Sequence, residues 1–436
     1  MRNSYTYYGF NKTMLLNVLF NISKNIDYIS VLVSNYNKNI SNLPKDYINY
    51  DIVAGIGCLD LIKSNNNSFE NLNDFQFKKR DWLFGYLSYD LKNEIEELKS
   101  NNIDNFNSSN ICFFIPEYVF LLNGSKLEIK TYHSKSSCTQ FVKDFNYSDF
   151  PRFNSTIYFN ARDDKKKYLK KIERIKNHIQ QGDIYEMNYC QEFYSKGNKI
   201  CPESVFLDLN KKMHTPFSSF LKLKEIYVLS ASPERFLKKK ANHILSQPIK
   251  GTRKRGETDI IDKNLITELK FSSKDICENV MIADLVRNDL SVTAKKASVS
   301  VYELCKVYTF KQVHQMITSI VSEVDSNVKF SDILKGSFPM GSMTGVPKVK
   351  SMQLIEYYEN FKRGIYSGSI GYITPELDFD FNVVIRTILY NLADKYLSIG
   401  VGGAITSQSD PNQEYEECLI KVKPLFEVLN FKINDF

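Results

Sequence analysis

The sequence predicts a mixed α+β fold whose sheets are mainly antiparallel. Strand-like runs follow one another along the 436-residue chain with turns between them. A regular alternation of strand and helix, which would indicate a doubly wound parallel sheet, is rare. The length suits one large domain or two closely packed ones. A change in composition near Asp149–Asn154 divides the chain into a first region, 1–150, and a second region, 151–436.

Short strands separated by polar loops are predicted in the first region. Ile29–Val33 and Trp82–Tyr89 have the apolar and aromatic composition of strands. Ser64–Asn67 and Asn101–Asn110 are rich in asparagine and serine, and we expect them to be surface loops.

Helix signals are clearest at the start of the second region. Asp163 or Asp164 can cap a helix that ends at Gly182. Its apolar stripe consists of Tyr168, Ile172, Ile175 and Ile179. A further helix is predicted at about Ser273–Asn288.

Strand signals surround these helices. Ile184–Phe193 alternates, with Glu186 on the face opposite Met187. Phe379–Tyr390 is the clearest strand of the chain, and Val401–Ala404 is predicted to be a glycine-rich bend. Two shorter candidates are Ile226–Leu229 and Leu245–Ile249.

Composition and charge exclude several classes of protein. Hydrophobic residues make up 43% and charged residues 25% of the chain, as in ordinary globular proteins. The net charge of +7 comes from scattered residues, whereas nucleic-acid binding requires a basic stripe. The N-terminus resembles neither a signal peptide nor a membrane anchor, and the eight cysteines never have CxxC spacing. We therefore expect a cytoplasmic protein with reduced thiols and neither nucleic-acid nor membrane partners.

Acidic residues at helical spacing are candidate metal ligands. Asp275 and Glu278 are three residues apart, and Glu414, Glu417 and Lys421 form another stripe. Two carboxylate pairs on neighbouring helices can bind Mg²⁺ directly and through water. Solvated helix surface is the alternative for either pair alone.

Two residues are candidate catalysts. Lys250 lies between proline and glycine at a strand end, and it can act as a nucleophile if burial lowers its pKa. Glu234 can be a buried acid or a plain turn residue.

His314 lies on an apolar strand, where a packed histidine is more common than a catalyst. Glycine and hydroxyl residues in 338–348 precede a helix and can form an anion cradle or a simple turn.

Seven motifs in register resemble those of the chorismate-utilising enzymes. They span roughly residues 155–425 and read, in order, SPERF, PIKGTRKRG, ENVMIADLVRNDL, FPMGSMTGVPK, RGIYSGSIGY, IRT and DPNQEYEE. The resemblance implies a four-layer α/β/β/α sandwich to which both regions of the chain contribute strands. It also implies binding of chorismate and of Mg²⁺.

Within this family, a lysine before the GT of the PIKGT motif is typical of the aminodeoxychorismate synthases, and an alanine there is typical of the anthranilate synthases. The resemblance therefore implies amination of chorismate by ammonia to 4-amino-4-deoxychorismate, a step toward 4-aminobenzoate and folate. By analogy, Lys250 attacks ring carbon 2 and Glu234 protonates the departing 4-hydroxyl.

The remaining roles are transferred by matching motif positions. His314 matches a catalytic position. Glu278 and Glu417 match direct Mg²⁺ ligands, with Asp275 and Glu414 behind them through water. The positions that match substrate-binding residues are Thr252, Ser342, Tyr366, Arg386, Gly402, Gly403 and Lys421.

Three positions depart from the family pattern. Glu186 replaces the usual glutamine of the aminating branches, and a carboxylate so near an anionic substrate is unfavourable unless it is protonated or paired. Asp275 is shorter than the usual glutamate, and Ala404 replaces a common glycine. Val31–Asn35 lies where relatives have a tryptophan pocket, and a buried strand end explains this segment as well.

Partners and alternatives complete the prediction. The sequence contains no GxCxG segment of a glutaminase, so we expect ammonia to come from a separate glutamine amidotransferase subunit or from solution. The alternatives are an anthranilate synthase component I, or a non-catalytic subunit that binds chorismate or tryptophan.

Overall fold

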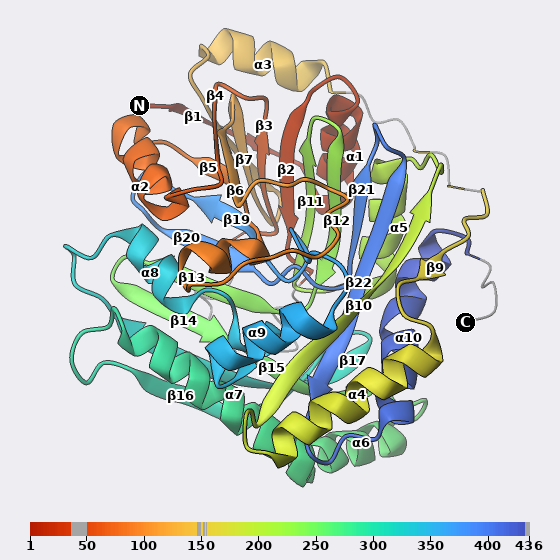
Figure 1. The fold of residues 1–436 in the computed structure, drawn as a ribbon. Coiled ribbons are helices and arrows are strands. Elements are labelled where there is room, and N and C mark those ends of the chain that lie inside the picture. Colours follow the sequence, from red (N-terminus) through yellow and green to blue (C-terminus); the bar gives the residue numbers. More distant parts are fainter. Residues whose placement is uncertain (36–49, 146–149, 151–152, 154, 432–436) are drawn as a thin grey trace.

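The computed structural model describes residues 1–35, 50–145, 150, 153 and 155–431. Two large sheets dominate the molecule, and every strand pair that they contain is antiparallel (Figure 1). The predicted α+β class is therefore confirmed.

The first sheet has 12 strands. Their bounds are β1 (Asn3–Tyr8), β2 (Tyr28–Val33), β3 (Ile52–Ile56), β7 (Tyr118–Asn123), β8 (Lys126–Thr131), β9 (Asn160–Ala161), β10 (Glu186–Lys196), β11 (Phe217–Leu223), β12 (Ile226–Ser232), β18 (Gly345–Val346), β21 (Thr387–Asn391) and β22 (Tyr396–Ile405). They are ordered β1-β8-β7-β3-β2-β11-β12-β21-β22-β10-β18, with β9 beside β10.

The second sheet has 10 strands. Their bounds are β4 (Asp60–Ser64), β5 (Leu83–Leu87), β6 (Ile111–Ile115), β13 (Arg235–Lys240), β14 (His243–Gln247), β15 (Ile249–Lys254), β16 (Ser300–Thr309), β17 (Val313–Glu323), β19 (Ser369–Ile373) and β20 (Phe379–Asn382). They are ordered β15-β17-β14-β13-β20-β19-β5-β6-β4, with β16 beside β17.

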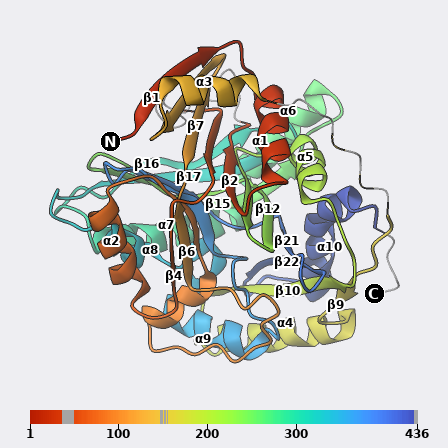
Figure 2. The same ribbon diagram turned by 90° about the horizontal axis from the view of Figure 1, so that it is seen from above.

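Helices cover the outer faces of the sheets (Figure 2). Their bounds are α1 (Lys12–Ser23), α2 (Ser68–Lys79), α3 (Lys135–Lys143), α4 (Lys165–Gln180), α5 (Pro202–Met213), α6 (Asp259–Phe271), α7 (Ser273–Ser291), α8 (Phe330–Ser337), α9 (Lys348–Tyr358) and α10 (Pro411–Val428), with short 3₁₀ helices η2 (Tyr89–Glu94) and η3 (Gly341–Met343). Among the described residues, none of these helices is long and apolar enough to cross a membrane.

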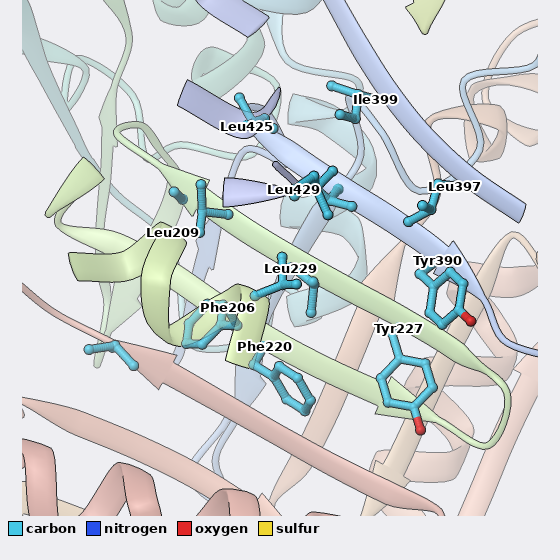
Figure 3. Packing of buried hydrophobic residues seen from close by; sticks show 14 of the residues in the cluster. Phe206, Leu209, Phe220, Tyr227, Leu229, Tyr390, Leu397, Ile399, Leu425 and Leu429 are labelled. Carbon is cyan, nitrogen blue, oxygen red and sulfur yellow. The ribbon is translucent and has the colours of Figure 1, made fainter. Parts of the chain in front are cut away.

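Alternation along the strands divides the hydrophobic core into two clusters. In β7, Phe120 and Leu122 join the cluster beneath the helices that cover the first sheet, whereas Val119 and Leu121 join the cluster that also contains residues of the second sheet. Figure 3 shows part of the first cluster, where side chains of α5 and α10 meet those of β11, β12, β21 and β22. The layers of the molecule therefore follow the order helices, first sheet, second sheet, helices.

Both regions of the chain build both sheets. Strand β2 of the first region pairs with β11, and β5 pairs with β19. The first region therefore contributes to a shared sandwich, as the resemblance implies. Most of the predicted boundary, Asp149–Asn154, lies outside the described residues.

The predicted helices form where the capping signals place them. Asp164 caps α4 by accepting a hydrogen bond from the amide of Lys167 at 2.8 Å. Tyr168, Ile172 and Ile175 of the predicted stripe are buried. The second predicted helix is α7, which begins at Ser273 and extends to Ser291.

Two strand predictions are wrong in detail. Phe379–Tyr390 is two strands, because β20 belongs to the second sheet and β21 to the first. Arg386 has a φ of 53°, which turns the chain as it crosses between the sheets. Val401–Ala404 is no bend but the middle of β22. A Cβ at Gly402 would lie 2.2 Å from the carbonyl oxygen of Tyr189, so the glycine permits a close approach of β10.

Candidate active site

Lys250 occupies a buried position where the two sheets come together. It is the second residue of β15, and its Nζ lies 2.6 Å from Oε1 of Glu186, the first residue of β10. The exposed fractions of the two side chains are 9% and 1%. Oε2 of Glu186 has no hydrogen-bond partner among the described residues. The carboxylate that departs from the family pattern is therefore paired, as its burial requires.

The backbone around Glu186 is fixed from two sides. Its carbonyl oxygen accepts a hydrogen bond from the Ser351 hydroxyl at 3.2 Å. It also lies 2.2 Å from the point that a Cβ of Gly345 would occupy, at a residue whose φ is 152°. Glycine is thus required in β18 for the strand to pair with Glu186.

Burial alone does not meet the condition set for a nucleophilic Lys250, because the pKa of this lysine is not lowered. Burial acts in that direction, but the carboxyl groups of Glu186, Glu278 and Glu234 outweigh it and raise the pKa. In the free protein, Lys250 is therefore an ammonium group. It can act as a nucleophile only after it has transferred a proton, and Glu186 is the carboxylate in contact with it.

Glu234 is a buried acid, not a plain turn residue. It lies between β12 and β13, where its carbonyl oxygen accepts a hydrogen bond from the Val383 amide at 3.1 Å. Only 5% of the residue is exposed. Burial raises the pKa of its carboxyl to about 7, although Lys250 acts in the opposite direction. A carboxyl group with this pKa can donate a proton near neutral pH.

The predicted metal ligands lie on two neighbouring helices. Glu278 of α7 and Glu414 of α10 face the same ammonium group, since Nζ of Lys274 lies 3.9 Å from Oε1 of Glu278 and 3.8 Å from Oε1 of Glu414. A single cation can therefore interact with both helices. Oε1 of Glu278 is buried and has no hydrogen-bond partner in the described chain. Oxygen donors of this kind suit a hard divalent cation.

The other two predicted ligands have cationic partners of their own. Asp275 accepts a hydrogen bond from Arg253 at 2.9 Å, and Oε1 of Glu417 lies 2.6 Å from Nζ of Lys421. Within the described ranges, no three His, Cys, Asp or Glu side chains are gathered closely enough to hold a metal ion by themselves. Binding of Mg²⁺ remains a prediction.

Several of the predicted substrate-binding residues meet where β22 packs on α10. Lys421 donates a hydrogen bond to the carbonyl oxygen of Gly402 at 2.8 Å, and Arg386 donates one to the carbonyl oxygen of Lys421 at 3.0 Å. A Cβ at Gly403 would lie 3.3 Å from Oε2 of Glu414, so this glycine keeps space free beside the acidic residues. Tyr366 is buried next to this group and contacts Cys190, with 3.6 Å between Oη and Sγ.

His314 and Thr252 are not brought into contact with Lys250 or Glu234. The His314 side chain is fully buried, and its ring nitrogens lie 2.8 Å from Asp262 and 2.9 Å from Thr309. Thr252 is exposed on β15. Their proposed roles have no support from contacts with these two catalytic candidates.

A pocket that is open to solvent lies beside β2, where the resemblance predicts a tryptophan pocket. Leu32, Val33 and Ser34 form part of its wall. The opposite wall contains the ion pair between Arg235 and Asp380, whose Nε–Oδ1 distance is 2.9 Å. Tryptophan binding itself remains a prediction.

Comparison with known proteins identifies the family of this chain. The family model for the chorismate binding enzymes matches residues 46–427 of this chain. The chain belongs to this family. The rice protein "Probable aminodeoxychorismate synthase, chloroplastic" is 33% identical over 380 residues, which cover 78% of this chain and 42% of the rice protein. The chain thus spans less than half the length of this relative.

Component proteins of more similar length also match. "Aminodeoxychorismate synthase component 1" of Escherichia coli is 30% identical over 79% of this chain and 76% of its own length. "Anthranilate synthase component 1" of Aquifex aeolicus is 30% identical over 80% and 74%. The crystal structure of anthranilate synthase component I from Streptococcus pneumoniae has the same fold, with a TM-score of 0.78 at 21% identity over 89% of this chain and 95% of that one.

The sequence predictions missed the roles of two residues. The sequence indicates that Glu186 must be protonated or paired, but it does not reveal that the partner is Lys250, 64 residues further along the chain. Lys274 was not singled out. Its spacing of four residues from Glu278 places the two side chains on one face of α7, which is a signal that the sequence contains.

Proposed function

We propose that the chain is the chorismate-aminating component of an aminodeoxychorismate synthase, which converts chorismate and ammonia to 4-amino-4-deoxychorismate. The observation that carries this proposal is the buried Lys250, 2.6 Å from a carboxylate that can accept its proton. Relatives named aminodeoxychorismate synthase, over most of this chain, add support.

The first half of the reaction forms a covalent bond to Lys250. Lys250 transfers a proton to Glu186 and becomes a free amine. Its nitrogen then bonds to ring carbon 2, the two conjugated double bonds of the ring both shift by one position, and the carbon 4–oxygen bond breaks. Glu234 gives its proton to the departing hydroxyl, which leaves as water.

The second half replaces Lys250 by ammonia. The nitrogen of ammonia bonds to carbon 4, both ring double bonds shift back, and the bond between carbon 2 and the Lys250 nitrogen breaks. The electron pair returns to Lys250. Two allylic displacements thus replace one difficult substitution, which is the usual advantage of a covalent intermediate.

Arg386 and Lys421 are the proposed partners of the substrate carboxylates, because they supply positive charge where β22 meets α10. Glu278 and Glu417 would hold Mg²⁺ directly, with Asp275 and Glu414 behind them, and the ion would neutralise a substrate carboxylate. The shared contact of Glu278 and Glu414 with Lys274 supports a cation position between α7 and α10.

The proposed source of ammonia is a separate glutamine amidotransferase subunit, in line with the designation "component 1" of the E. coli relative. The second candidate function is that of an anthranilate synthase component I, which the Aquifex relative favours. Its product would be aromatic, and pyruvate would be released.

A product assay tests the proposal. The chain is incubated with chorismate, Mg²⁺ and concentrated ammonium near pH 8, in parallel with Lys250→Ala, and the products are separated by chromatography. We expect aminodeoxychorismate from the wild type, and a loss of its formation on the order of a thousandfold or more in the variant. Anthranilate from the wild type would contradict the proposal and support the second candidate.

A further inference from the structure

A small interior cavity adjoins Glu234. It is enclosed between the β12–β13 turn, β13, α7 and the segment from the end of α8 to η3. Every residue that lines it is buried. The cavity has room for a molecule of about the size of water. Its apolar lining comes from Phe236, Leu237, Val286, Leu290, Met340 and Val383.

Polar groups interrupt this apolar lining at a few points. The Ser337 hydroxyl, on a residue that is 4% exposed, has no hydrogen-bond partner in the described chain. The Ser342 hydroxyl lies beside the Glu234 carboxyl and interacts with it. Asp289 also lines the cavity, and its carboxylate lies 2.6 Å from Nζ of Lys348.

An occupant of this cavity must be small and must satisfy these groups. A buried hydroxyl without a partner costs about 1–3 kcal/mol, so a polar molecule is favoured over an empty space. The carboxyl groups of Glu234 and Asp289 and the two hydroxyls can all accept hydrogen bonds. Arg235 also lines the cavity, but its guanidinium group is engaged by Asp380 and Gln247. A small molecule that carries several N–H donors matches this set.

The position of Glu234 connects the cavity with the reaction. In the proposed function, on which this inference rests, Glu234 protonates the hydroxyl that leaves carbon 4, so its carboxyl must lie beside that carbon. The new nitrogen must reach the same carbon. The cavity adjoins Glu234, so a nitrogen held there has only a short distance to travel.

We propose that this cavity is the binding site of the ammonium ion that supplies the new amino group, and that Ser337 is one of its ligands. After Glu234 has given up its proton, its carboxylate takes one proton from ammonium. The resulting ammonia bonds to carbon 4 through its lone pair while the carbon 2–Lys250 bond breaks. Glu234 is then protonated again, Lys250 is a free amine, and the product carries an ammonium group.

The test is the dependence of amination on ammonium concentration, measured with the whole chain and no glutaminase. Ser337→Val fills the space and removes the hydroxyl. We expect the KM for ammonium to rise about threefold to tenfold, as the loss of a buried hydrogen bond predicts, while the KM for chorismate stays unchanged. The matched control is Ser322→Ala, since the Ser322 hydroxyl in β17 is also buried without a partner but does not line the cavity.

A second measurement uses the wild type and does not depend on the reaction. Thallium(I) has nearly the radius of ammonium and scatters anomalously, so crystals soaked in it should give a peak between Ser337 and Glu234. An unchanged KM for ammonium in a folded Ser337→Val variant would overturn the proposal. Where that variant does not fold, the absence of the thallium peak would do so. Failure of the wild type to form aminated product is a different result, because it contradicts the proposed function itself.

Discussion

Two buried ion pairs in the molecule serve different purposes, and their hydrogen bonds distinguish them. Arg363 and Glu359 have side chains that are each 1% exposed. Arg363 donates to both carboxylate oxygens of Glu359, at 2.9 and 2.6 Å, and to the carbonyl oxygens of Met343 and Asn188. Glu359 also accepts a hydrogen bond from the Cys190 amide at 2.8 Å. This pair therefore fastens β10 to η3.

The pair of Lys250 and Glu186 is equally close but incomplete. Only Oε1 of Glu186 is engaged, by Lys250 at 2.6 Å, and Oε2 has no hydrogen-bond partner in the described residues. Leaving such a group unsatisfied costs stability. A saturated buried pair thus indicates support of the fold, and an incomplete one indicates a site prepared for a ligand or a proton transfer.

The largest effect on stability is expected for the saturated pair. Arg363→Met leaves Glu359 and two carbonyl oxygens without their donor, so the free energy of unfolding should fall by about 3–5 kcal/mol. Urea denaturation measures the change. The neighbouring Lys362→Met is the matched control, because its pair with Asp104 is partly exposed and should contribute about 0–1 kcal/mol. Equal losses in the two variants would contradict the comparison.

Replacement of Glu234 should have the opposite effect on stability, because the free energy of unfolding relative to wild type should increase as the pH rises. Its pKa is raised to about 7 in the folded protein, above the ordinary value of 4.5, so the folded state binds more protons between these values. The contribution of Glu234 to stability is therefore lost as the pH rises from about 4.5 to 7. Glu234→Gln does not titrate, and its unfolding free energy relative to wild type should rise by about 1–3 kcal/mol over this window while amination is lost.

Denaturation at pH 5 and pH 8 measures this difference. Glu128→Gln is the control, because burial of the Glu128 carboxyl is outweighed by hydrogen bonds from Ser4 and Lys130, which lower its pKa, so the stability of this variant relative to wild type should not rise with pH. A Glu234→Gln variant whose stability relative to wild type does not change with pH would show that Glu234 is not a buried acid.

The sequence predicted those features that depend on local spacing and on motifs. The cap at Asp164 and the stripe of α4 follow from neighbouring residues, and they form as predicted. The division of Phe379–Tyr390 between two sheets depends on the backbone turn at Arg386, which the alternation of apolar residues does not reveal. The pKa of Lys250 depends on carboxylates that are far away in the sequence, so the residues around Lys250 could not decide whether it is lowered or raised. The cavity at Ser337 likewise exists only after α7 and α8 have packed against β13.

The smallest expected effect concerns the incomplete pair. Glu186→Gln removes the negative charge nearest to Lys250 but preserves a hydrogen-bonding side chain, so the pKa of Lys250 should fall. Glu186 can no longer take the proton, so Lys250 must lose it to solvent, and the acid limb of the kcat/KM profile should move up by about one unit or more. Glu278 and Glu234 still face Lys250 and limit the fall of its pKa. At high pH, where Lys250 has lost its proton in both proteins, the rates should differ by less than about tenfold.

Glu192→Gln is the matched control in the same strand, since Glu192 pairs with Arg162 at 2.6 Å and not with Lys250. If the acid limb of the kcat/KM profile lies at the same pH in Glu186→Gln, in the wild type and in the control, Glu186 does not set the protonation state of Lys250.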